Sequence, residues 1–382
     1  MIDLNKDVLK YLQDSEQEAL DLLETLCQIP APSGNEHKRA EFIKNWLTEN
    51  GAKQVIIDDA LNVLCPIGCE NKNDIVIFMA HTDVVFPDTT PLPFRKDEDC
   101  FYCPGVGDDT CGVVMLLMVI KYILKNNLVA PCGILFALNS CEEGLGDLKG
   151  IKQIMKDYDD RVSAVYTFDG NYTHIVNACV GSHRYEVSFA TEGGHSFGAF
   201  GNRNAIAAMS KVICELYACK VPEKQGAKTT FNVGIVEGGT SVNTIAQNAK
   251  MLFEYRSDDK DCLAYMQNYF EKTIEKAKND NIADIQVKMV GNRPCGGDVD
   301  KVKLEQMTQN SINICQKHSG VSCKIDTGST DCNIPMSLGV PAVCVGAWTS
   351  AGTHTREEKL FLKSIPIGLK ITAELILEYF EK

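Results

Sequence analysis

The hydrophobic and polar positions in the first half of the chain show two different patterns. Apolar residues recur at helical spacing in four stretches, residues 6–28, 36–49, 112–125 and 149–158. Between them stand three short, continuous apolar runs, residues 75–80, 134–138 and 164–168. Runs of this kind are typical of strands buried on both faces. Strands that alternate with helices predict a mostly parallel sheet with helices on both sides.

The pattern changes after residue 180. Residues 184–189 alternate polar and apolar side chains, which is typical of a strand with one solvated face. The expected elements of this segment are a strand at 184–189, a helix at 204–219, strands at 230–236 and 248–255, a helix at 261–278 and a strand at 285–290. The order β-α-β-β-α-β is the ferredoxin-like arrangement.

The α/β rhythm then resumes with a helix at 301–318, a strand at 342–345 and a last helix at 360–379. We therefore predict an α/β fold, with a doubly wound, mixed but mostly parallel sheet in a domain of residues 1–180 and 295–382. A ferredoxin-like α+β domain, residues 181–294, is inserted into it. Ser33 and Glu36 form a capping-box pattern, so we expect them to cap the second helical stretch.

Composition and charge narrow the function. Hydrophobic residues make up 45% of the 382 positions and charged residues 23%, as in ordinary globular proteins. The net charge of −13 argues against a nucleic-acid partner, because phosphate binding requires basic patches. The 17 scattered cysteines and an N-terminus without an apolar signal core predict a reducing, cytoplasmic location. The longest apolar run, Val113–Ile120, is too short to span a bilayer, so we expect no membrane partner.

Ligands of open α/β sheets bind beyond the carboxyl ends of the strands, so the residues that follow each strand carry the candidate chemistry. Each candidate strand is followed by a histidine or by carboxylates: His81 and Asp83, Asp108 and Asp109, Glu142 and Glu143, Asp169, and near the C-terminus His354. Such a cluster of like charge at one sheet edge indicates bound divalent metals. Histidine and carboxylate ligands without thiolates favour catalytic zinc, and there are enough of them for two ions.

The chemistry of such a centre suggests a division of labour. A carboxylate that bridges two ions leaves room for a water whose pKa falls towards neutrality, and a second carboxylate can take the proton of that water. The adjacent pair Glu142 and Glu143 fits this division, with one side chain on the metal and the other on the water. Asp83, two residues after His81, can orient the imidazole ring.

The motifs come in an order that resembles one family. They are Ile29–Glu36, His81-x-Asp83, Gly107-Asp108-Asp109-Thr110-x-Gly112, Cys141-Glu142-Glu143-Gly144, Phe168-Asp169-Gly170, Gly193-Gly194-His195-Ser196 and His354-x-x-x-Glu358. Together they resemble the cocatalytic zinc exopeptidases that include peptidase T, glutamate carboxypeptidase, aminoacylase and succinyl-diaminopimelate desuccinylase. The resemblance extends over essentially the whole chain, including the inserted segment.

The resemblance implies a role for each matching residue. One zinc ion is bound by His81 and Asp169 and the other by Glu143 and His354, with Asp108 as the bridge between them. Glu142 acts as general base and then as general acid, and Asp83 orients His81.

In this family the inserted domain closes over the substrate and often forms a homodimer. His195 matches a histidine that helps to hold the oxyanion, often in the partner subunit's active site. Arg256 resembles an arginine that clamps a substrate carboxylate, with Asn243 as its companion. Ser329 and Thr330 lie in a stretch that resembles a substrate-binding loop.

Two departures from the family stand beside the bridging aspartate. Many relatives have lysine at the position of Thr110, and Arg-Gly where this chain has Pro104-Gly105. Neither change replaces a ligand, but both leave the substrate preference open. The Asp108-Asp109 pair resembles the peptidase T side of the family more than the desuccinylase side.

The sequence also allows three other interpretations. Cys65 and Cys69, with Cys100 and Cys103, would allow a separate structural zinc site, although a whole strand separates the two pairs. A thioredoxin-like redox role is disfavoured, because the Cys-x-x-Cys motif does not open a helix. A non-catalytic relative that only binds metal or peptide is a further alternative, which the intact ligand set disfavours.

The prediction is a cytoplasmic metallo-exopeptidase of di- or tripeptides, with two zinc ions per subunit that Mn or Co could replace. The main alternative is an N-acyl-amino-acid amidohydrolase, a deacetylase or desuccinylase. Both enzymes cleave an amide with the same activated water, so the metal ligands do not distinguish them. The sequence leaves open which terminus is cleaved.

Overall fold

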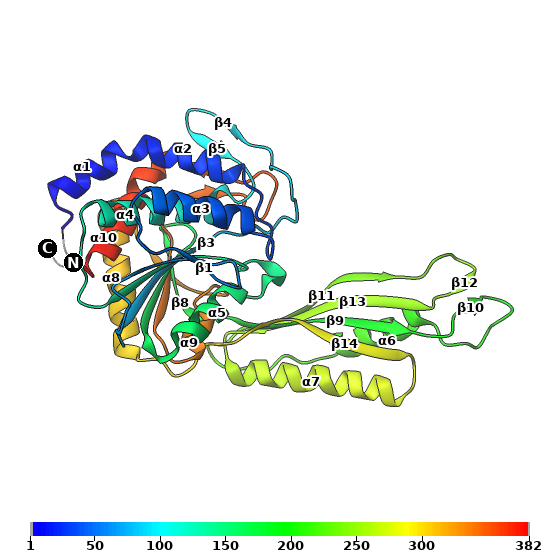
Figure 1. The fold of residues 1–382 in the computed structure, drawn as a ribbon. Coiled ribbons are helices and arrows are strands. Elements are labelled where there is room, and N and C mark those ends of the chain that lie inside the picture. The colour runs from blue at the N-terminus through cyan, green and yellow to red at the C-terminus, as the bar shows by residue number, and fades with distance from the viewer. Residues whose placement is uncertain (1–2, 381–382) are drawn as a thin grey trace. The chain divides into compact units, whose positions relative to one another are not determined.

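The computed structural model describes residues 3–380 of the chain. Contacts between Cα atoms divide the chain into two compact units. The first unit comprises Met1–Ala178 and Gly297–Lys382, and the second comprises Cys179–Gly296. In Figure 1 the second unit carries the green to yellow part of the colour scale.

The first unit is built on an eight-stranded mixed sheet. Its strands, in spatial order, are β1 (Ile56–Ile57), β2 (Val63–Ile67), β6 (Gly133–Asn139), β3 (Ile75–His81), β7 (Val162–Phe168), β16 (Ala342–Val345), β8 (His174–Cys179) and β15 (Lys324–Gly328). The four central strands β6, β3, β7 and β16 are parallel. The pairs β1–β2, β2–β6 and β16–β8 are antiparallel. Parallel central strands have their carboxyl ends at one edge of the sheet.

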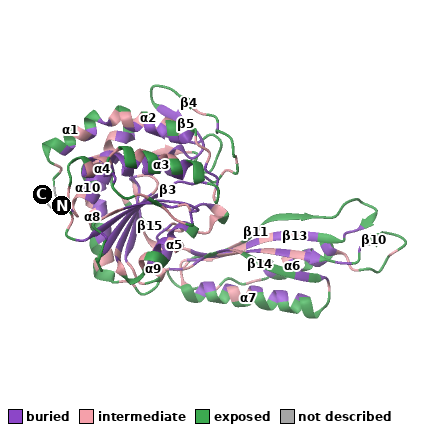
Figure 2. Cartoon of the chain, in the orientation of Figure 1, coloured by how far each residue is buried: buried purple, intermediate pink, exposed green. Residues whose placement is uncertain are grey.

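The apolar runs of the sequence form the centre of this sheet. Every residue of β3 and β6 is buried, as expected for parallel strands covered on both faces (Figure 2). Val76, Phe78 and Ala80 of β3 belong to the main hydrophobic core of the unit. Side chains alternate between faces along a strand, so Ile77 and Met79 point to the other side of the sheet.

Helices form layers against the faces of this sheet. Those of the first unit are α1 (Lys6–Asp14), α2 (Glu16–Cys27), α3 (His37–Glu49), α4 (Gly112–Lys125), α5 (Lys149–Tyr158), α8 (Lys301–Ser319), α9 (Asn333–Ser337) and α10 (Ile365–Leu377). The α4 helix packs on β3 and against α10, which also contacts α8 and α1. The α5 and α9 helices contact each other and lie on the opposite side of the sheet (Figure 1).

A second, small antiparallel sheet corrects one sequence prediction. It consists of β17 (Ser350–Ala351), β18 (Lys359–Phe361), β5 (Cys100–Tyr102) and β4 (Arg95–Lys96). The last helix was expected from residue 360, but it begins at Ile365. Leu360 instead pairs with Phe101 across β18 and β5, and this pairing is not visible in a helical pattern of apolar positions.

The expected capping box is also wrong. The α3 helix begins at His37, and Glu36 at its N-terminus makes no side-chain capping bond. The Ser33 hydroxyl donates to Asp83 at 2.6 Å, and Glu36 accepts the backbone N–H of Gly34 at 2.8 Å. Both side chains are therefore engaged with neighbours other than the helix end.

The second unit has the βαββαβ order expected from the sequence. Its elements are β9 (Gly181–Ala190), α6 (Ala205–Tyr217), β11 (Thr229–Gly238), β13 (Asn248–Ser257), α7 (Lys260–Asn279) and β14 (Asp284–Arg293). The sheet is antiparallel with the order β11-β13-β9-β14. A short pair, β10 (Gly194–His195) and β12 (Thr244–Ile245), extends from it. The predicted fold class, a mixed and mostly parallel sheet with a ferredoxin-like insertion, is confirmed.

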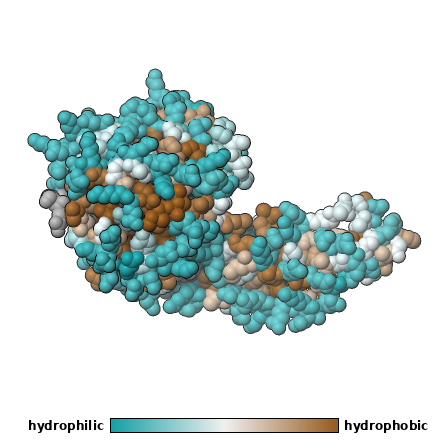
Figure 3. Space-filling view, viewed as in Figure 1, coloured by the Kyte–Doolittle hydropathy of each residue, from teal (hydrophilic) through white to brown (hydrophobic). Residues whose placement is uncertain are grey.

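Period-two alternation explains how this smaller sheet packs. Val187 and Phe189 of β9 join Met251 and Phe253 of β13 in a core with residues of α6 and α7. The α7 helix turns its remaining, hydrophilic side outward, as the space-filling view shows (Figure 3). The second unit therefore has a hydrophobic core of its own.

Within residues 3–380, no helix combines the length and the apolar character needed to cross a membrane.

The stability of the first unit can be tested in the middle of α4. Leu116 is fully buried in the core, so Leu116→Ala is expected to lower the free energy of unfolding by about 2–5 kcal/mol. Both tryptophans, Trp46 and Trp348, lie in the first unit, and urea unfolding followed by tryptophan fluorescence therefore reports on this unit alone. The matched control is Leu338→Ala at a residue 62% exposed, where a change within about 0.5 kcal/mol is expected. Equal effects of the two substitutions would contradict this account of the core.

Candidate metal centre

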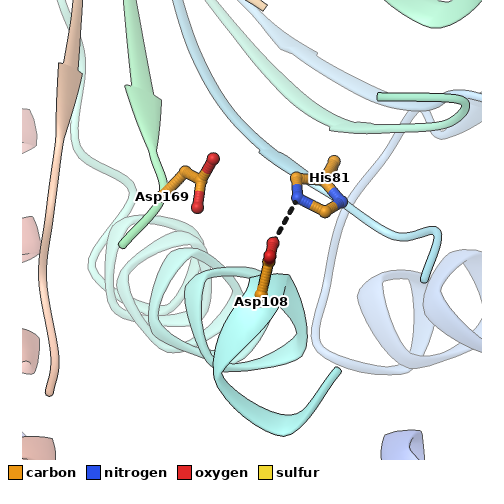
Figure 4. Close-up of side chains that lie close together, drawn as sticks. All are labelled: His81, Asp108 and Asp169. Atoms are coloured by element: carbon orange, nitrogen blue, oxygen red, sulfur yellow. Dashed lines mark hydrogen bonds and ion pairs between the residues drawn. The ribbon is translucent and has the colours of Figure 1, made fainter. Parts of the chain in front are cut away.

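Three side chains from separate segments meet at the carboxyl edge of the main sheet. His81 ends β3, Asp169 follows β7, and Asp108 comes from the turn before α4 (Figure 4). One potential ligand atom of each lies within 4.8 Å of the others. His81 Nε2 is 3.0 Å from Asp108 Oδ1. The three residues could therefore hold one metal ion.

A second group shares Asp108 with the first. Ligand atoms of Asp108, Glu143 and His354 also lie within 4.8 Å of one another. His354 Nε2 is 2.8 Å from Glu143 Oε1 and 3.1 Å from Asp108 Oδ2. The two oxygens of Asp108 thus face different histidines, and this carboxylate could be shared by two ions.

Glu142 lies beside both groups. Its carboxylate, His81 and Glu143 form a third set of ligand atoms within 4.8 Å of one another. The side chain of Glu142 is buried, with 7% exposure. A carboxylate in this position can accept a proton from a group held between the two sets.

Asp83 fixes the backbone of Glu142 and Glu143 by hydrogen bonds. Its two oxygens accept the N–H groups of Glu142 and Glu143, each at 2.9 Å. Asp83 Oδ1 also lies 3.4 Å from His81 Nδ1, on the side of the ring away from Asp108. Burial opposes ionisation of Asp83, but the hydrogen bonds with His81 and Ser33 outweigh it and lower its pKa.

The electrostatics of the site show a surplus of buried negative charge. Burial and the neighbouring Asp108 and Glu143 raise the pKa of Asp169 to about 7. The hydrogen bonds to Asp108 and Glu143 raise the pKa of His354 to about 11. Burial opposes protonation of His81, yet its hydrogen bonds to Asp108 and Asp83 raise its pKa well above the ordinary value. Protons on the two histidines thus offset part of this negative charge in the metal-free protein.

The donor set fits a pair of divalent metal ions. It offers imidazole nitrogens and carboxylate oxygens, which are the ligands of catalytic zinc, and it contains no thiolate. Cations would replace the protons on the histidines and compensate the remaining negative charge. Among residues 3–380, no cysteine belongs to a potential metal-binding group, which removes the support for a structural zinc site at Cys65, Cys69, Cys100 and Cys103.

The origin of Asp108 differs from the sequence prediction. It does not follow a strand of the main sheet but stands in the irregular turn Val106–Cys111, between β5 and α4. The peptide bond to Asp109 is cis. Asp109 is buried behind the site, where its carboxylate accepts the backbone N–H of His81 at 2.7 Å. Burial raises the pKa of Asp109 well above the ordinary value.

Sequence reasoning assigned no role to the buried Arg39. Its guanidinium donates to the carbonyl oxygens of Leu26, Ile29 and Thr82 and to the hydroxyl of Thr110. Thr82 follows His81, and Thr110 follows the Asp108-Asp109 pair. The arginine therefore joins the two segments that carry these ligands. The signal available in the sequence was an arginine on the apolar face of the helix that became α3. Its hydrogen-bond partners could not be read from the sequence.

Glu36 also supports the site, although the sequence predicted only a helix cap for it. Its Oε1 accepts the N–H of Cys141 at 3.1 Å, in addition to that of Gly34. Cys141 has a positive φ of 58°, at the start of the turn that presents Glu142 and Glu143. Burial and Asp83 raise the pKa of Glu36.

Ser329 and Thr330 lie in the loop between β15 and α9. Thr330 is fixed at both ends, since its N–H donates to Asn333 and its hydroxyl accepts the N–H of Cys332. The adjacent Asp331 accepts a hydrogen bond from Asn139 at the end of β6, at 2.7 Å. The charge of Asp331 also contributes to the raised pKa of Asp169. This loop is therefore close to the metal-ligand candidates of the first unit.

His195 and Asn243 come together within the second unit. They stand on the paired segments around β10 and β12, where Ser196 N–H donates to the Asn243 carbonyl at 3.0 Å. His195 Nδ1 accepts the N–H groups of Phe197 and Gly198 at 3.3 and 3.4 Å. A nitrogen that accepts hydrogen bonds carries no proton, so the proton of the neutral ring is on Nε2. The exposed imidazole thus presents an N–H donor.

Arg256 of β13 is engaged in a bidentate ion pair. Its Nε and Nη2 each lie 3.0 Å from an oxygen of Glu254. The Arg256 side chain is 37% exposed, and Glu254 also contacts Arg184 at 3.3 Å. The guanidinium already shows the two-pronged geometry that carboxylate recognition requires.

Comparisons with known proteins agree with the resemblance seen in the sequence. The family model for peptidase family M20/M25/M40 matches residues 77–378. Succinyl-diaminopimelate desuccinylase of Corynebacterium glutamicum is 23% identical to the chain, over 90% of this chain and 92% of the relative.

Solved structures show the same fold. A tripeptidase from Staphylococcus aureus has a TM-score of 0.71 at 23% identity, over 94% of this chain and 97% of that one. A dinuclear metal-binding peptidase from Bacillus subtilis has a TM-score of 0.62 at 16% identity, over 96% and 99%. The family resemblance is thereby confirmed, and the chain belongs to peptidase family M20/M25/M40.

Proposed function

We propose that this protein is a dinuclear metal-dependent exopeptidase that hydrolyses short peptides such as di- and tripeptides. The observation that carries the proposal is the pair of ligand groups that share Asp108, with Glu142 beside them. The family match to a peptidase supports it, as do the fold neighbours described as a tripeptidase and as a dinuclear metal-binding peptidase. We propose zinc as the metal, with Mn or Co as substitutes that reconstitution would distinguish.

In the proposed centre His81 and Asp169 would hold one ion, Glu143 and His354 would hold the other, and both would share Asp108. The chemistry that such ions would supply is Lewis acidity, towards the scissile carbonyl and a water. Asp83 orients His81 through Nδ1, so that Nε2 stays directed at the site.

Glu142 is the proposed proton carrier. Its carboxylate accepts a proton from the attacking water and later donates it to the departing amine. Two observations support this role: Glu142 is buried beside the ligand groups, and its backbone N–H is held by Asp83. A carboxylate with restricted motion and little contact with bulk water is suited to such a transfer.

The second unit, Cys179–Gly296, is proposed to act as a lid and as a dimerisation module on the catalytic unit. His195 Nε2–H would donate to the oxyanion, with Asn243 as its companion, in the active site of a partner subunit. The His195 tautomer supports this role, since Nδ1 is occupied by backbone N–H groups. Ser329 and Thr330 are proposed substrate contacts. A homodimer in the cytoplasm is part of the same proposal.

Arg256 is the proposed clamp for the terminal carboxylate of a short peptide. Without substrate, Glu254 occupies both prongs of the guanidinium. A substrate carboxylate would replace at least one of these contacts, so Glu254 would keep the guanidinium oriented between turnovers. Capture of a free carboxylate restricts the enzyme to chain ends.

The second candidate is an N-acyl-amino-acid amidohydrolase. The likeness to a succinyl-diaminopimelate desuccinylase over nine-tenths of the chain favours it. The same ligand groups and the same proton carrier would serve both reactions. The metal-loaded protein, assayed with dipeptides, tripeptides and N-acetyl and N-succinyl amino acids, is expected to show the highest kcat/KM on peptides. A clear preference for the acylated amino acids would overturn the peptidase proposal and support the amidohydrolase.

The role of Glu142 is tested by Glu142→Gln. The amide cannot accept the proton, so kcat for tripeptide hydrolysis is expected to fall by roughly 10²- to 10⁴-fold. Glu41→Gln, at an exposed glutamate of α3, serves as the control and should leave kcat unchanged. Metal content is measured in both variants. If Glu142→Gln keeps both its metal and its activity, another group carries the proton.

Metal uptake is expected to release protons. The pKa values of His81 and His354 are raised in the metal-free protein, so both rings carry protons at neutral pH that an incoming cation must displace. Zinc affinity should therefore rise with pH between about pH 6 and about pH 8. Calorimetry in buffers of different ionisation enthalpy measures the proton release directly. An affinity independent of pH would contradict the assignment of these histidines.

The Arg256 clamp is tested with peptide pairs that differ only in a free or an amidated C-terminus. The wild type is expected to prefer the free carboxylate by roughly 10- to 100-fold in kcat/KM, the value of a charge-assisted hydrogen-bond pair. Arg256→Lys keeps the charge but loses the two parallel N–H donors of the guanidinium, so this variant should lose most of the preference. Lys250→Met, on the same strand, is the control and should retain it. Equal discrimination by wild type and Arg256→Lys would rule out the clamp.

A further inference from the structure

Glu358 is a buried carboxylate that the proposed mechanism does not use. It directly precedes β18 and is 1% exposed. It stands four residues after His354, and its backbone carbonyl accepts the N–H of Cys103 at 3.2 Å. The pairing of β18 with β5 holds the following residue, Lys359, opposite Tyr102. The backbone of Glu358 is therefore anchored to the segment that leads to Asp108.

The carboxylate of Glu358 binds the turn that carries Asp108. Oε2 accepts the N–H of Gly105 at 2.6 Å, and Oε1 accepts those of Gly107 and Asp108 at 3.0 and 2.9 Å. Three backbone donors of one turn thus converge on a single side chain. Charge-assisted hydrogen bonds of this kind are shorter and stronger than those between neutral groups.

The turn itself is shaped for this contact. Gly105 has a positive φ of 77°, a conformation that glycine adopts at little cost. A Cβ atom at Gly107 would lie 3.0 Å from Glu358 Oε1 and 2.7 Å from Ser350 Cβ. The backbone therefore approaches Glu358 and β17 more closely than a side chain would permit.

The same residue is tied to the segment of His354. His354 has a positive φ of 62°, next to a turn in which Thr355 N–H donates to the Gly352 carbonyl at 2.9 Å. The N–H of Glu358 donates to the Thr355 carbonyl at 3.3 Å, which closes the turn against it. Glu358 thus contacts both the backbone of Asp108 and the turn that follows His354, and the side chains of Asp108 and His354 lie 3.1 Å apart.

We infer that Glu358 is a positioning residue: its carboxylate holds the Gly105–Asp108 turn so that Asp108 and His354 are placed for the metal ion that they share with Glu143. Metal affinity depends on how well the ligands are preorganised, and partners behind the ligands contribute to it by about 10- to 100-fold. The inference rests on the proposed dinuclear centre. Beyond that proposal, Glu358 would control the affinity of the ion held by Asp108, Glu143 and His354 without contacting metal or substrate itself.

The test compares Glu358→Gln with Glu357→Gln, an exposed neighbour that serves as the matched control. The glutamine can still accept two N–H groups through its oxygen, but its NH₂ faces the N–H of Gly105 and cannot accept it. Zinc binding is measured by competition with a chromophoric chelator, and the cobalt-substituted proteins are compared by visible absorption. The activation constant for zinc and kcat at saturating zinc are measured separately.

The expected result for Glu358→Gln is a weaker second site, by about 10- to 100-fold, with a smaller loss of affinity at the first site, which shares Asp108 but not His354. The activation constant should rise by the same factor, whereas kcat at saturating zinc should stay within a few-fold of wild type. Glu357→Gln should match wild type in every measurement. A merely structural role would instead lower the urea midpoint of the metal-free protein and leave the two zinc affinities unchanged.

The outcomes separate this inference from the function on which it rests. If the wild type binds no metal, the proposed dinuclear function fails. If the wild type binds two ions and Glu358→Gln binds both with unchanged affinity, the proposed function stands and the positioning role of Glu358 is overturned. If Glu358→Gln does not fold, Glu358→Asp decides the question. That variant keeps the charge but shortens the reach, so it should fold and show the weakened second site, and an unchanged second site would overturn the inference.

Discussion

The arrangement of the first unit depends on the burial of several carboxylates at one sheet edge. Charges of one sign in a poorly solvated place repel one another and lack water, so each must find compensation within the protein. Asp108 finds it in His81 and His354, whereas burial and the neighbouring carboxylates raise the pKa of Asp169 to about 7. In the proposed function, metal ions would compensate both carboxylates. The supporting carboxylates are stabilised differently: Glu36, Asp83 and Glu358 each accept backbone N–H groups from a turn. These N–H groups offset part of the cost of burial, although burial still raises the pKa values of Glu36 and Glu358. They also fix the turns that present the ligands.

This constraint explains why the ligands come from loops that rigid elements support. The buried parallel strands β3 and β7 deliver His81 and Asp169 to one edge with little freedom. Asp108 and His354 have no such support from the main sheet, because they lie in irregular segments. Side chains from elsewhere fix those segments, and the clearest case is Glu358 on the Asp108 turn. Arg39 adds support through the carbonyl oxygen of Thr82 and the hydroxyl of Thr110, which follow His81 and the Asp108-Asp109 pair.

The two units divide the chemistry of the chain. The first holds the metal-ligand candidates and Glu142, whereas the second holds a histidine with a defined donor nitrogen and an arginine paired with a carboxylate. Each unit has its own hydrophobic core, so each can present its groups on a stable scaffold.

The sequence by itself determined the fold class, the order of most elements, and the residues whose spacing places them at strand ends. The periodicity of apolar positions indicates which strands are buried, and the residues that follow a buried strand lie at the edge of the sheet. His81, Glu143 and Asp169 could therefore be named as candidate ligands without coordinates. Only the tertiary structure decided the partners of the remaining charges. Ser33 looked like a helix cap, but it bonds Asp83 fifty residues away, and Leu360 looked helical but pairs with Phe101. For Ser33 the physical reason is that a buried carboxylate such as Asp83 without hydrogen-bond partners costs more than a local capping bond contributes. For Leu360 the reason is burial of an apolar side chain in the core through strand pairing, a long-range contact that no local pattern contains.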